Sequence, residues 1–128
     1  MQYPLTSIRS GNDNAGMWVS IGYRSKDGAQ HMLHIVGGEE RSALPIGRSL
    51  VPIYFERDDQ VLSCYEGADK ISVTDRSVTL TLNKNGRNSL ELPNIVEFTV
   101  AKPSRDFKQA KTMLAEMKNR QGGEVIHY

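Results

Sequence analysis

The residues of this chain that could do chemistry gather in one polar segment near its middle. Residues 54–60 read Tyr-Phe-Glu-Arg-Asp-Asp-Gln, and residues 63–67 read Ser-Cys-Tyr-Glu-Gly. Carboxylates grouped in this way can share general acid and base roles in catalysis. However, Asp58 and Asp59 are adjacent, and neighbouring side chains of an extended chain point to opposite sides. The spacing therefore gives little support to a catalytic carboxylate pair.

The same segment has two other interpretations, which its chemistry supports equally. In the first, the charges form a loop that protects an edge strand from pairing with other chains. In the second, exposed tyrosines and carboxylates form a recognition surface for a basic protein, because carboxylates steer a cationic partner toward the surface. Both interpretations place the segment at the end of a strand.

Other nucleophile or metal sites receive little support from the sequence. Cys64 could pair with one of the three histidines, His31, His34 and His127. No helix N-terminus follows Cys64 to make its thiol reactive, and a lone cysteine is usually a small buried hydrophobe. His31 and His34 are three residues apart in a strand pattern, so they point to opposite faces, and no third ligand lies nearby. We therefore predict no catalytic residue, no bound metal and no cofactor.

The composition indicates one globular domain over residues 1–128. Of the 128 residues, 38% are hydrophobic and 24% are charged, and the formal net charge is +1. This near-balance argues against a general nucleic-acid binder, which carries a basic excess on one face. A single cysteine excludes an internal disulfide. Because we find no signal-peptide pattern and no apolar run of about 20 residues, we expect a cytoplasmic protein.

Alternation of apolar and polar residues predicts an antiparallel sheet, and it is clearest through residues 71–82. We predict strands at residues 2–8, 17–24, 30–36, 50–56, 70–74, 78–82, 89–92 and 95–100. Turns are predicted at residues 26–28, 75–77 and 83–86, and polar loops at residues 10–16 and 39–49. Pro52 cannot donate to a strand ladder, which suggests either an edge position for its strand or a place at the strand's beginning.

A helix is predicted near the C-terminus. Ser104 can cap its first turn, and the glycines at 122–123 can end it. One apolar stripe follows the cap, at Phe107, Ala110, Leu114 and Met117. Because the stripe is narrow, the helix should lie on the surface of the sheet. Together these elements predict an α+β fold, a mostly antiparallel β-sheet of about seven to eight strands with a C-terminal helix.

Three parts of the chain resemble one known family. Residues 53–60, residues 63–67 and the strand pair at 71–82 resemble immunity protein family ten. Members of this family are small bacterial proteins encoded beside polymorphic toxins, including contact-dependent inhibition systems. The resemblance lies in the Glu-Arg-x-Asp-Gln spacing, in the Cys-Tyr-x-Gly turn and in strands rich in Ser, Leu and Thr. It covers residues 50–82 of the 128 residues.

The resemblance implies a stoichiometric inhibitor that binds a cognate toxin domain and blocks its active site or substrate path, without turnover or cofactor. The motif residues could hold the fold together or contact the toxin, and the contacts could instead lie in loops 10–16 and 37–49. The candidate partner-binding residues are Tyr54, Glu56, Arg57, Asp58, Asp59, Gln60, Tyr65, Glu66, Glu39 and Glu40. The partner would be a protein, not a membrane or a nucleic acid, and a homodimer is left open.

Two other functions stay open from the sequence alone. One is a small enzyme that uses Asp58, Asp59 or Cys64. The other is a small β-rich regulatory module that self-associates through the edge strand at Pro52. Turnover assays of Asp58→Ala and Cys64→Ala would expose the enzyme, and light scattering at rising concentration would expose self-association.

Overall fold

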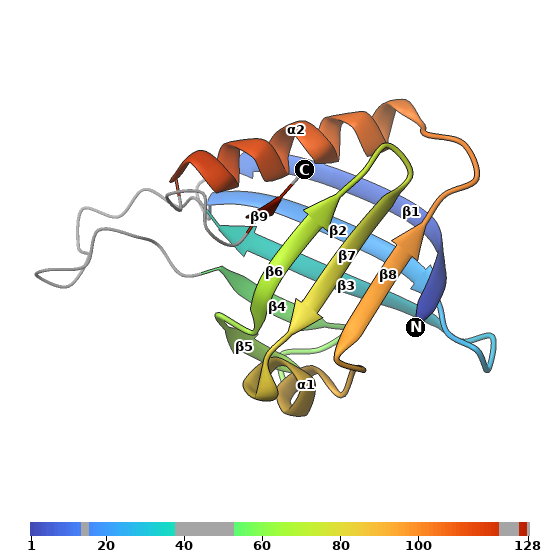
Figure 1. Cartoon of the computed structure of the whole chain (residues 1–128), viewed down its shortest axis with the longest axis vertical. Helices are drawn as coiled ribbons and strands as arrows, with labels where there is room; N and C mark the ends of the chain where they lie inside the picture. Colours follow the sequence, from blue (N-terminus) through green and yellow to red (C-terminus); the bar gives the residue numbers. More distant parts are fainter. Residues whose placement is uncertain (14–15, 38–52, 121–125, 128) are drawn as a thin grey trace, which may run out of the picture.

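The computed structural model describes residues 1–13, 16–37, 53–120 and 126–127. Over these residues the chain forms one sheet and two helices (Figure 1). The predicted α+β class, with a mostly antiparallel sheet and a helix near the C-terminus, is confirmed. Neither described helix is long and apolar enough to cross a membrane. Pro52 and the first residues of the strand predicted at 50–56 lie outside the described residues.

Nine strands make up the sheet within the described residues. They are β1 (Gln2–Asp13), β2 (Gly16–Arg24), β3 (Gln30–Gly37), β4 (Tyr54–Arg57), β5 (Ser63–Tyr65), β6 (Ala68–Val73), β7 (Ser77–Leu82), β8 (Ile95–Thr99) and β9 (Ile126–His127). Helix α1 covers Lys84–Leu90 and helix α2 covers Arg105–Arg120. Across the sheet the order is β5-β4-β3-β2-β1-β8-β7-β6-β9. Neighbouring strands are antiparallel except for the parallel pairs β1–β8 and β6–β9.

Strand β1 joins the two halves of the sheet. Its residues 2–4 pair with β8, and its residues 5–13 pair with β2. The sheet bends at this strand, so β2–β4 and β6–β8 lie across from one another with the core between them (Figure 1). The rings of Tyr3, Tyr23 and Phe98 cluster there, with centroids 4.9–6.3 Å apart. Aromatic packing therefore joins β1, β2 and β8 where the two halves meet.

Alternation along the strands supplies this core. On β2 the side chains of Val19, Ile21 and Tyr23 are buried, whereas Ser20 lies between them on the outer face. The predicted alternation at residues 71–82 appears in the same way in β6 and β7. Burying one aliphatic side chain of this size stabilises the fold by about 1.5–3 kcal/mol. The shared inner face therefore holds the bent sheet together.

Helix α2 lies across one end of the bent sheet. Ser104 Oγ accepts a hydrogen bond from the backbone N–H of Phe107 at 3.1 Å, as expected of the predicted N-cap. The predicted apolar stripe is buried, at Phe107, Ala110, Leu114 and Met117. The helix packs against β1, β2 and β9 (Figure 1), and its other side is polar and exposed. It thus covers the sheet, as expected, and adds its stripe to the core.

The strand predicted at residues 89–92 is wrong, because this part of the chain forms the end of α1. Asn83 is extended, and its side-chain oxygen accepts a hydrogen bond from the N–H of Gly86 at 2.9 Å. Residues 83–86 therefore begin a helix instead of turning between two strands. Glu91 ends the helix in the left-handed region, at φ 54°. Leu90, which suggested a strand, is the buried anchor of the helix.

The polar loop predicted at residues 10–16 is also largely wrong. β1 continues to Asp13, and β2 begins at Gly16. Gly11 lies under the indole of Trp18, and a Cβ on Gly11 would come 2.7 Å from Trp18 Cζ2. This glycine therefore marks a close approach within the sheet and not a turn.

Two short strands are not predicted by the sequence pattern. β5 pairs with β4 at residues 63–65, where no strand was predicted, and β9 pairs with β6 beyond the C-terminal helix. They contain three and two residues, respectively, which is too short for alternation to be recognised.

Gly86 provides a test of the contact between α1 and the segment before β6. A Cβ at position 86 would overlap the carbonyl oxygen of Gly67. Alanine normally stabilises a helix relative to glycine by about 1 kcal/mol. Here we expect Gly86→Ala to lower the free energy of unfolding by about 1–3 kcal/mol through overpacking. Urea denaturation measures the change against Asn88→Ala on the exposed side of α1, and equal stability would contradict the close approach.

Candidate functional site

The polar segment of the sequence forms the β4–β5 hairpin at one edge of the sheet. β4 lies between β3 and β5, and no further described strand pairs with β5. Phe55 and Cys64 are buried in the core. Tyr54, Glu56 and Tyr65 alternate with them and face outward. The hairpin therefore has an inner side that contributes to the fold and an outer side that faces away from the core.

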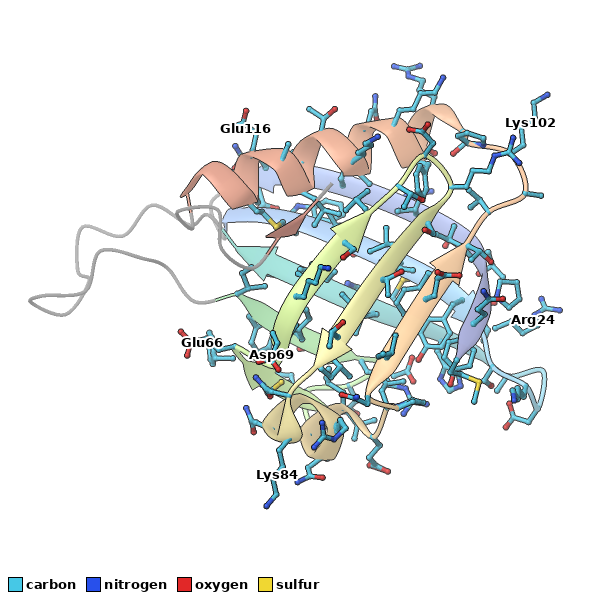
Figure 2. The ribbon with its side chains drawn as sticks, in the orientation of Figure 1. Arg24, Glu66, Asp69, Lys84, Lys102 and Glu116 are labelled. Atoms are coloured by element: carbon cyan, nitrogen blue, oxygen red, sulfur yellow. The ribbon has the colours of Figure 1, made fainter. Side chains whose placement is uncertain are left out.

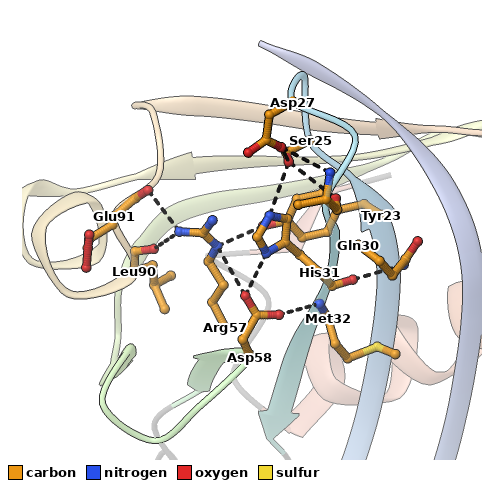
Figure 3. Close-up of polar contacts among 11 residues, drawn as sticks. Tyr23, Ser25, Asp27, Gln30, His31, Met32, Arg57, Asp58, Leu90 and Glu91 are labelled. Carbon is orange, nitrogen blue, oxygen red and sulfur yellow. Dashed lines mark hydrogen bonds and ion pairs between the residues drawn. The ribbon is translucent and has the colours of Figure 1, made fainter.

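Arg57 is the central residue of the inner side (Figure 3). Its Nε donates a hydrogen bond to the hydroxyl of Tyr23 at 3.0 Å. Its Nη1 donates to the main-chain carbonyls of Leu90 and Glu91 at 3.1 and 3.2 Å. These carbonyls lie at the C-terminal end of α1, where unpaired C=O groups favour a cation. Arg57 thus ties β4 to β2 and to α1.

Asp58 is fixed beside Arg57 in a left-handed backbone conformation, with φ 62°. Its Oδ1 accepts a hydrogen bond from the N–H of Met32 at 2.8 Å, and its Oδ2 lies 2.7 Å from His31 Nδ1. Burial alone would raise the pKa of Asp58. The hydrogen bonds from His31 and Met32, with the charge of Arg57, outweigh burial and hold the pKa below its usual value. Asp58 is therefore an ionised group engaged within the fold.

Ser25, His31 and Asp58 form a chain of contacts in the order used by serine hydrolases. Ser25 Oγ lies 3.2 Å from His31 Nε2, and His31 Nδ1 contacts Asp58. However, the Ser25 hydroxyl also donates to the carboxylate of Asp27 and lies 3.3 Å from the carbonyl of Ala29. A carboxylate at this place holds the proton and would repel the oxyanion of an acyl-transfer intermediate. The geometry therefore favours a structural link between two turns over nucleophilic catalysis.

The outer side of the hairpin carries two tyrosines and a carboxylate. The rings of Tyr54 and Tyr65 lie 5.0 Å apart and are tilted by 53°. The hydroxyl of Tyr54 donates to Glu56 Oε1 at 2.8 Å, which holds the carboxylate next to the ring pair. Tyr65 is 56% exposed, so the ring pair is accessible from solvent. This arrangement suits contact with another molecule.

The turn between β4 and β5 is exposed and is shaped by its own hydrogen bonds. The carboxylate of Asp59 accepts from the N–H of Val61 at 3.1 Å, and the hydroxyl of Ser63 donates to the carbonyl of Gln60 at 2.6 Å. The residues Asp59 and Gln60 are exposed, and Val61 is 84% exposed. The turn thus presents an apolar side chain beside an acid and an amide.

The remaining predicted residues are exposed, buried or outside the described part of the chain. Glu66 is exposed directly after β5, and its side chain projects outward (Figure 2). Cys64 is buried, as expected, and burial raises the pKa of its thiol, which disfavours the nucleophilic thiolate. Glu39 and Glu40 lie outside the described residues.

The sequence pattern did not identify Tyr23 and His31 as parts of this site. Their rings stack with centroids 5.3 Å apart, and both contact the Arg57 and Asp58 pair. His31 could have been identified from the sequence, because it lies on the same face of β3 as the core residue Leu33. A polar group on such a face needs a partner, and Asp58 provides it.

The two strand histidines point to opposite faces of β3, as predicted. His31 stacks on the core residue Tyr23, whereas His34 Nδ1 lies 2.6 Å from Ser20 Oγ on the outer face. The described residues contain no group of three or more side chains placed to hold a metal ion.

Comparison with known proteins provides no further guide to this site. No family model, curated protein or solved structure matches the chain. The function is therefore inferred from the geometry of the hairpin and from the resemblance within residues 50–82.

Arg57→Lys tests the bridge between β4, β2 and α1. Lysine keeps the charge but cannot reproduce the planar fork of donors, so the hydroxyl of Tyr23 or the carbonyls at the end of α1 lose a partner. We expect the free energy of unfolding to fall by about 1–3 kcal/mol in urea denaturation. Arg24→Lys, at the exposed end of β2, is the control. Equal stability of the two variants would count against the bridge.

Asp58→Asn tests the charge of Asp58, since asparagine also tolerates the left-handed conformation. Folding lowers the pKa of this carboxyl below its ordinary 3.8. The ionised group therefore stabilises the fold at neutral pH, and this contribution is lost as the pH falls through the lowered pKa. We expect the wild type to exceed Asp58→Asn in stability at pH 7, with a difference that shrinks below about pH 4. Urea denaturation across this range measures it, and a constant difference would exclude the charge as its cause.

Proposed function

We propose that this protein is an immunity protein that binds the toxic domain of a bacterial polymorphic toxin and blocks its active site or substrate path. The observation that carries the proposal is the division of the β4–β5 hairpin into an inner side engaged in hydrogen bonds within the fold and an outer side that faces away from the core. Arg57 and Asp58 are held within the fold. Tyr54, Glu56 and Tyr65 face outward from the same rigid frame. Aromatic and acidic side chains presented in this way suit recognition of another protein.

The charge of the hairpin indicates the kind of partner. Residues 53–67 contain one guanidinium, Arg57, and four carboxylates, Glu56, Asp58, Asp59 and Glu66. Because Arg57 and Asp58 offset each other on the inner side, the carboxylates of Glu56 on the outer side and of Asp59 in the turn give the hairpin a local negative charge. Such a surface attracts a cationic protein and repels the phosphates of nucleic acid. A toxin domain with a basic surface around its active site would be a matching partner.

Exposed apolar surface at the same edge would add affinity. Val61 and Tyr65 are 84% and 56% exposed, and both belong to the hairpin or its turn. Removing apolar surface from water contributes about 25 cal/mol per Å². Tyrosine is also among the residues enriched at the energetic centres of protein interfaces. The hairpin thus combines charge that steers a partner with surface that can retain it.

Binding to the substrate site of the toxin would be enough to inhibit it. A projecting turn and sheet edge can enter a concave substrate site and exclude the substrate, without turnover or cofactor. We place this action in the cytoplasm, where a free cysteine such as the buried Cys64 is commonly found.

The geometry gives the two alternatives less support. An enzyme based on Asp58 would have to release a carboxylate held by His31 and Met32, and one based on Cys64 would need a buried thiol to ionise. The strand after Pro52 is not an edge strand, because β4 lies between β3 and β5, so self-association at this side of the sheet would have to use β5, which has three residues. So short an edge offers few groups for pairing with a second chain.

Calorimetric titration against the C-terminal domain of the protein encoded beside this one tests the proposal. We expect tight one-to-one binding and a parallel loss of the toxin's activity. Tyr65→Ala should weaken binding about tenfold or more, because it removes an exposed aromatic contact. Ile95→Ala, an exposed apolar position on β8 in the other half of the sheet, is the matched control. Absence of binding at micromolar concentrations would reject the immunity function.

A further inference from the structure

The two hairpin tyrosines belong to a longer row of large side chains on the outer face of the sheet. In the strand register, each member lies opposite the next from β2 to β5, and the outer-face row is Trp18, Val36, Tyr54 and Tyr65. The residues that alternate with them along the four strands are buried in the core: Val19, Ile35, Phe55 and Cys64. The four side chains therefore project from one face, across three strand spacings or about 14 Å.

The far end of the outer-face row is held in place. Trp18 packs over the backbone of Gly11, where a side chain would collide with the indole. Its Nε1 donates to Asp13 Oδ2 at 3.2 Å. Trp18 is half-buried by these contacts. An aromatic side chain fixed before binding loses little conformational freedom on binding, which favours affinity.

A polar row runs beside the outer-face row. Ser20, His34, Glu56 and Ser63 lie opposite one another on the same four strands. Ser20 and His34 are joined by a 2.6 Å hydrogen bond, and Glu56 is oriented by Tyr54. An apolar strip with a polar border has the organisation of a protein interface, in which aromatic residues form the centre and polar groups the rim.

We propose that the outer-face row is the centre of the partner's footprint, and that the partner places an arginine side chain against the rings of Tyr54 and Tyr65 and the carboxylate of Glu56. The inference rests on the proposed function for the identity of the partner, but not for the chemistry of the surface. A guanidinium can stack on an aromatic ring while it donates to a carboxylate. Glu56 holds one tyrosine hydroxyl at Oε1, and an ionised carboxylate has about four acceptor sites.

Charge distinguishes this occupant from the alternatives. A nucleic acid would bring phosphates to the carboxylates of Glu56 and Asp59, while the one guanidinium of the hairpin faces inward. A second copy of this chain, packed face to face about a two-fold axis at the hairpin, would place the same carboxylates against each other. A basic protein surface pairs with these groups and covers the aromatic strip at the same time.

Two peptides of equal charge test the chemistry of the surface without the toxin. The ¹⁵N-labelled protein is titrated with hexaarginine amide and with hexalysine amide, and the indole N–H of Trp18, the single tryptophan, gives one reporter signal. We expect hexaarginine to shift signals on β2–β5, including Trp18 and Tyr65, at several-fold lower concentration than hexalysine. Glu56→Gln should abolish this preference, whereas Glu97→Gln, on the outer face of β8, should not. Equal responses to the two peptides, or shifts elsewhere, would overturn the inference.

The toxin domain then tests the footprint. We expect Trp18→Ala and Glu56→Gln each to weaken its binding about tenfold or more, and Glu97→Gln to change it less than about twofold. Tight binding that leaves the Trp18 indole signal and the Glu56→Gln affinity unchanged would reject the footprint while the proposed function stands. If the domain does not bind at all, the proposed function fails, and the peptide titrations decide the inference by themselves.

Discussion

The guanidinium of Arg57 joins three parts of the fold that are distant in sequence. Its own backbone belongs to β4, and it donates to Tyr23 on β2 and to the last carbonyls of α1. A largely buried cation is costly unless its donors are satisfied, so these three elements can pack in few other ways. Asp58 extends the constraint to β3 through His31 and Met32. The outer side chains of the hairpin share this rigidity because each one alternates with a residue fixed on the inner side.

The inner network also separates two roles that the sequence presents as one motif. Within five consecutive residues, Arg57 and Asp58 hydrogen-bond within the fold, whereas Glu56 lies on the outer face of the sheet and Asp59 and Gln60 lie in the exposed turn. Changes at the outer positions would leave the hydrogen bonds of Arg57 and Asp58 in place. The hydrogen-bonded inner side of the hairpin can therefore stay constant while the surface that contacts a partner varies.

Much of the sheet could be predicted from alternation, because β2, β3, β6 and β7 each bury one face. The prediction failed at α1, where the chain follows the cap at Asn83 and a backbone contact between Gly67 and Gly86. The sequence located the hairpin but not the direction of its charged side chains. Arg57 and its partner Tyr23 are 34 residues apart in the sequence, and Asp58 and its partner His31 are 27 residues apart. Contacts at such separations cannot be predicted from a local sequence pattern.

Strand β1 has a consequence for how the molecule reaches its native state. The side chains of Gln2 and Glu97, which hydrogen-bond across the β1–β8 pair, are 95 residues apart. The hairpins on either side of β1 close locally, but joining them requires a long loop to close, which slows folding. During synthesis at about 5–20 residues per second, β1 would wait roughly 5–20 seconds for β8 to be made. Until then residues 2–4 of β1 lack their partner strand, so this part of the chain is exposed to aggregation during the seconds between translation of the first and the eighth strand.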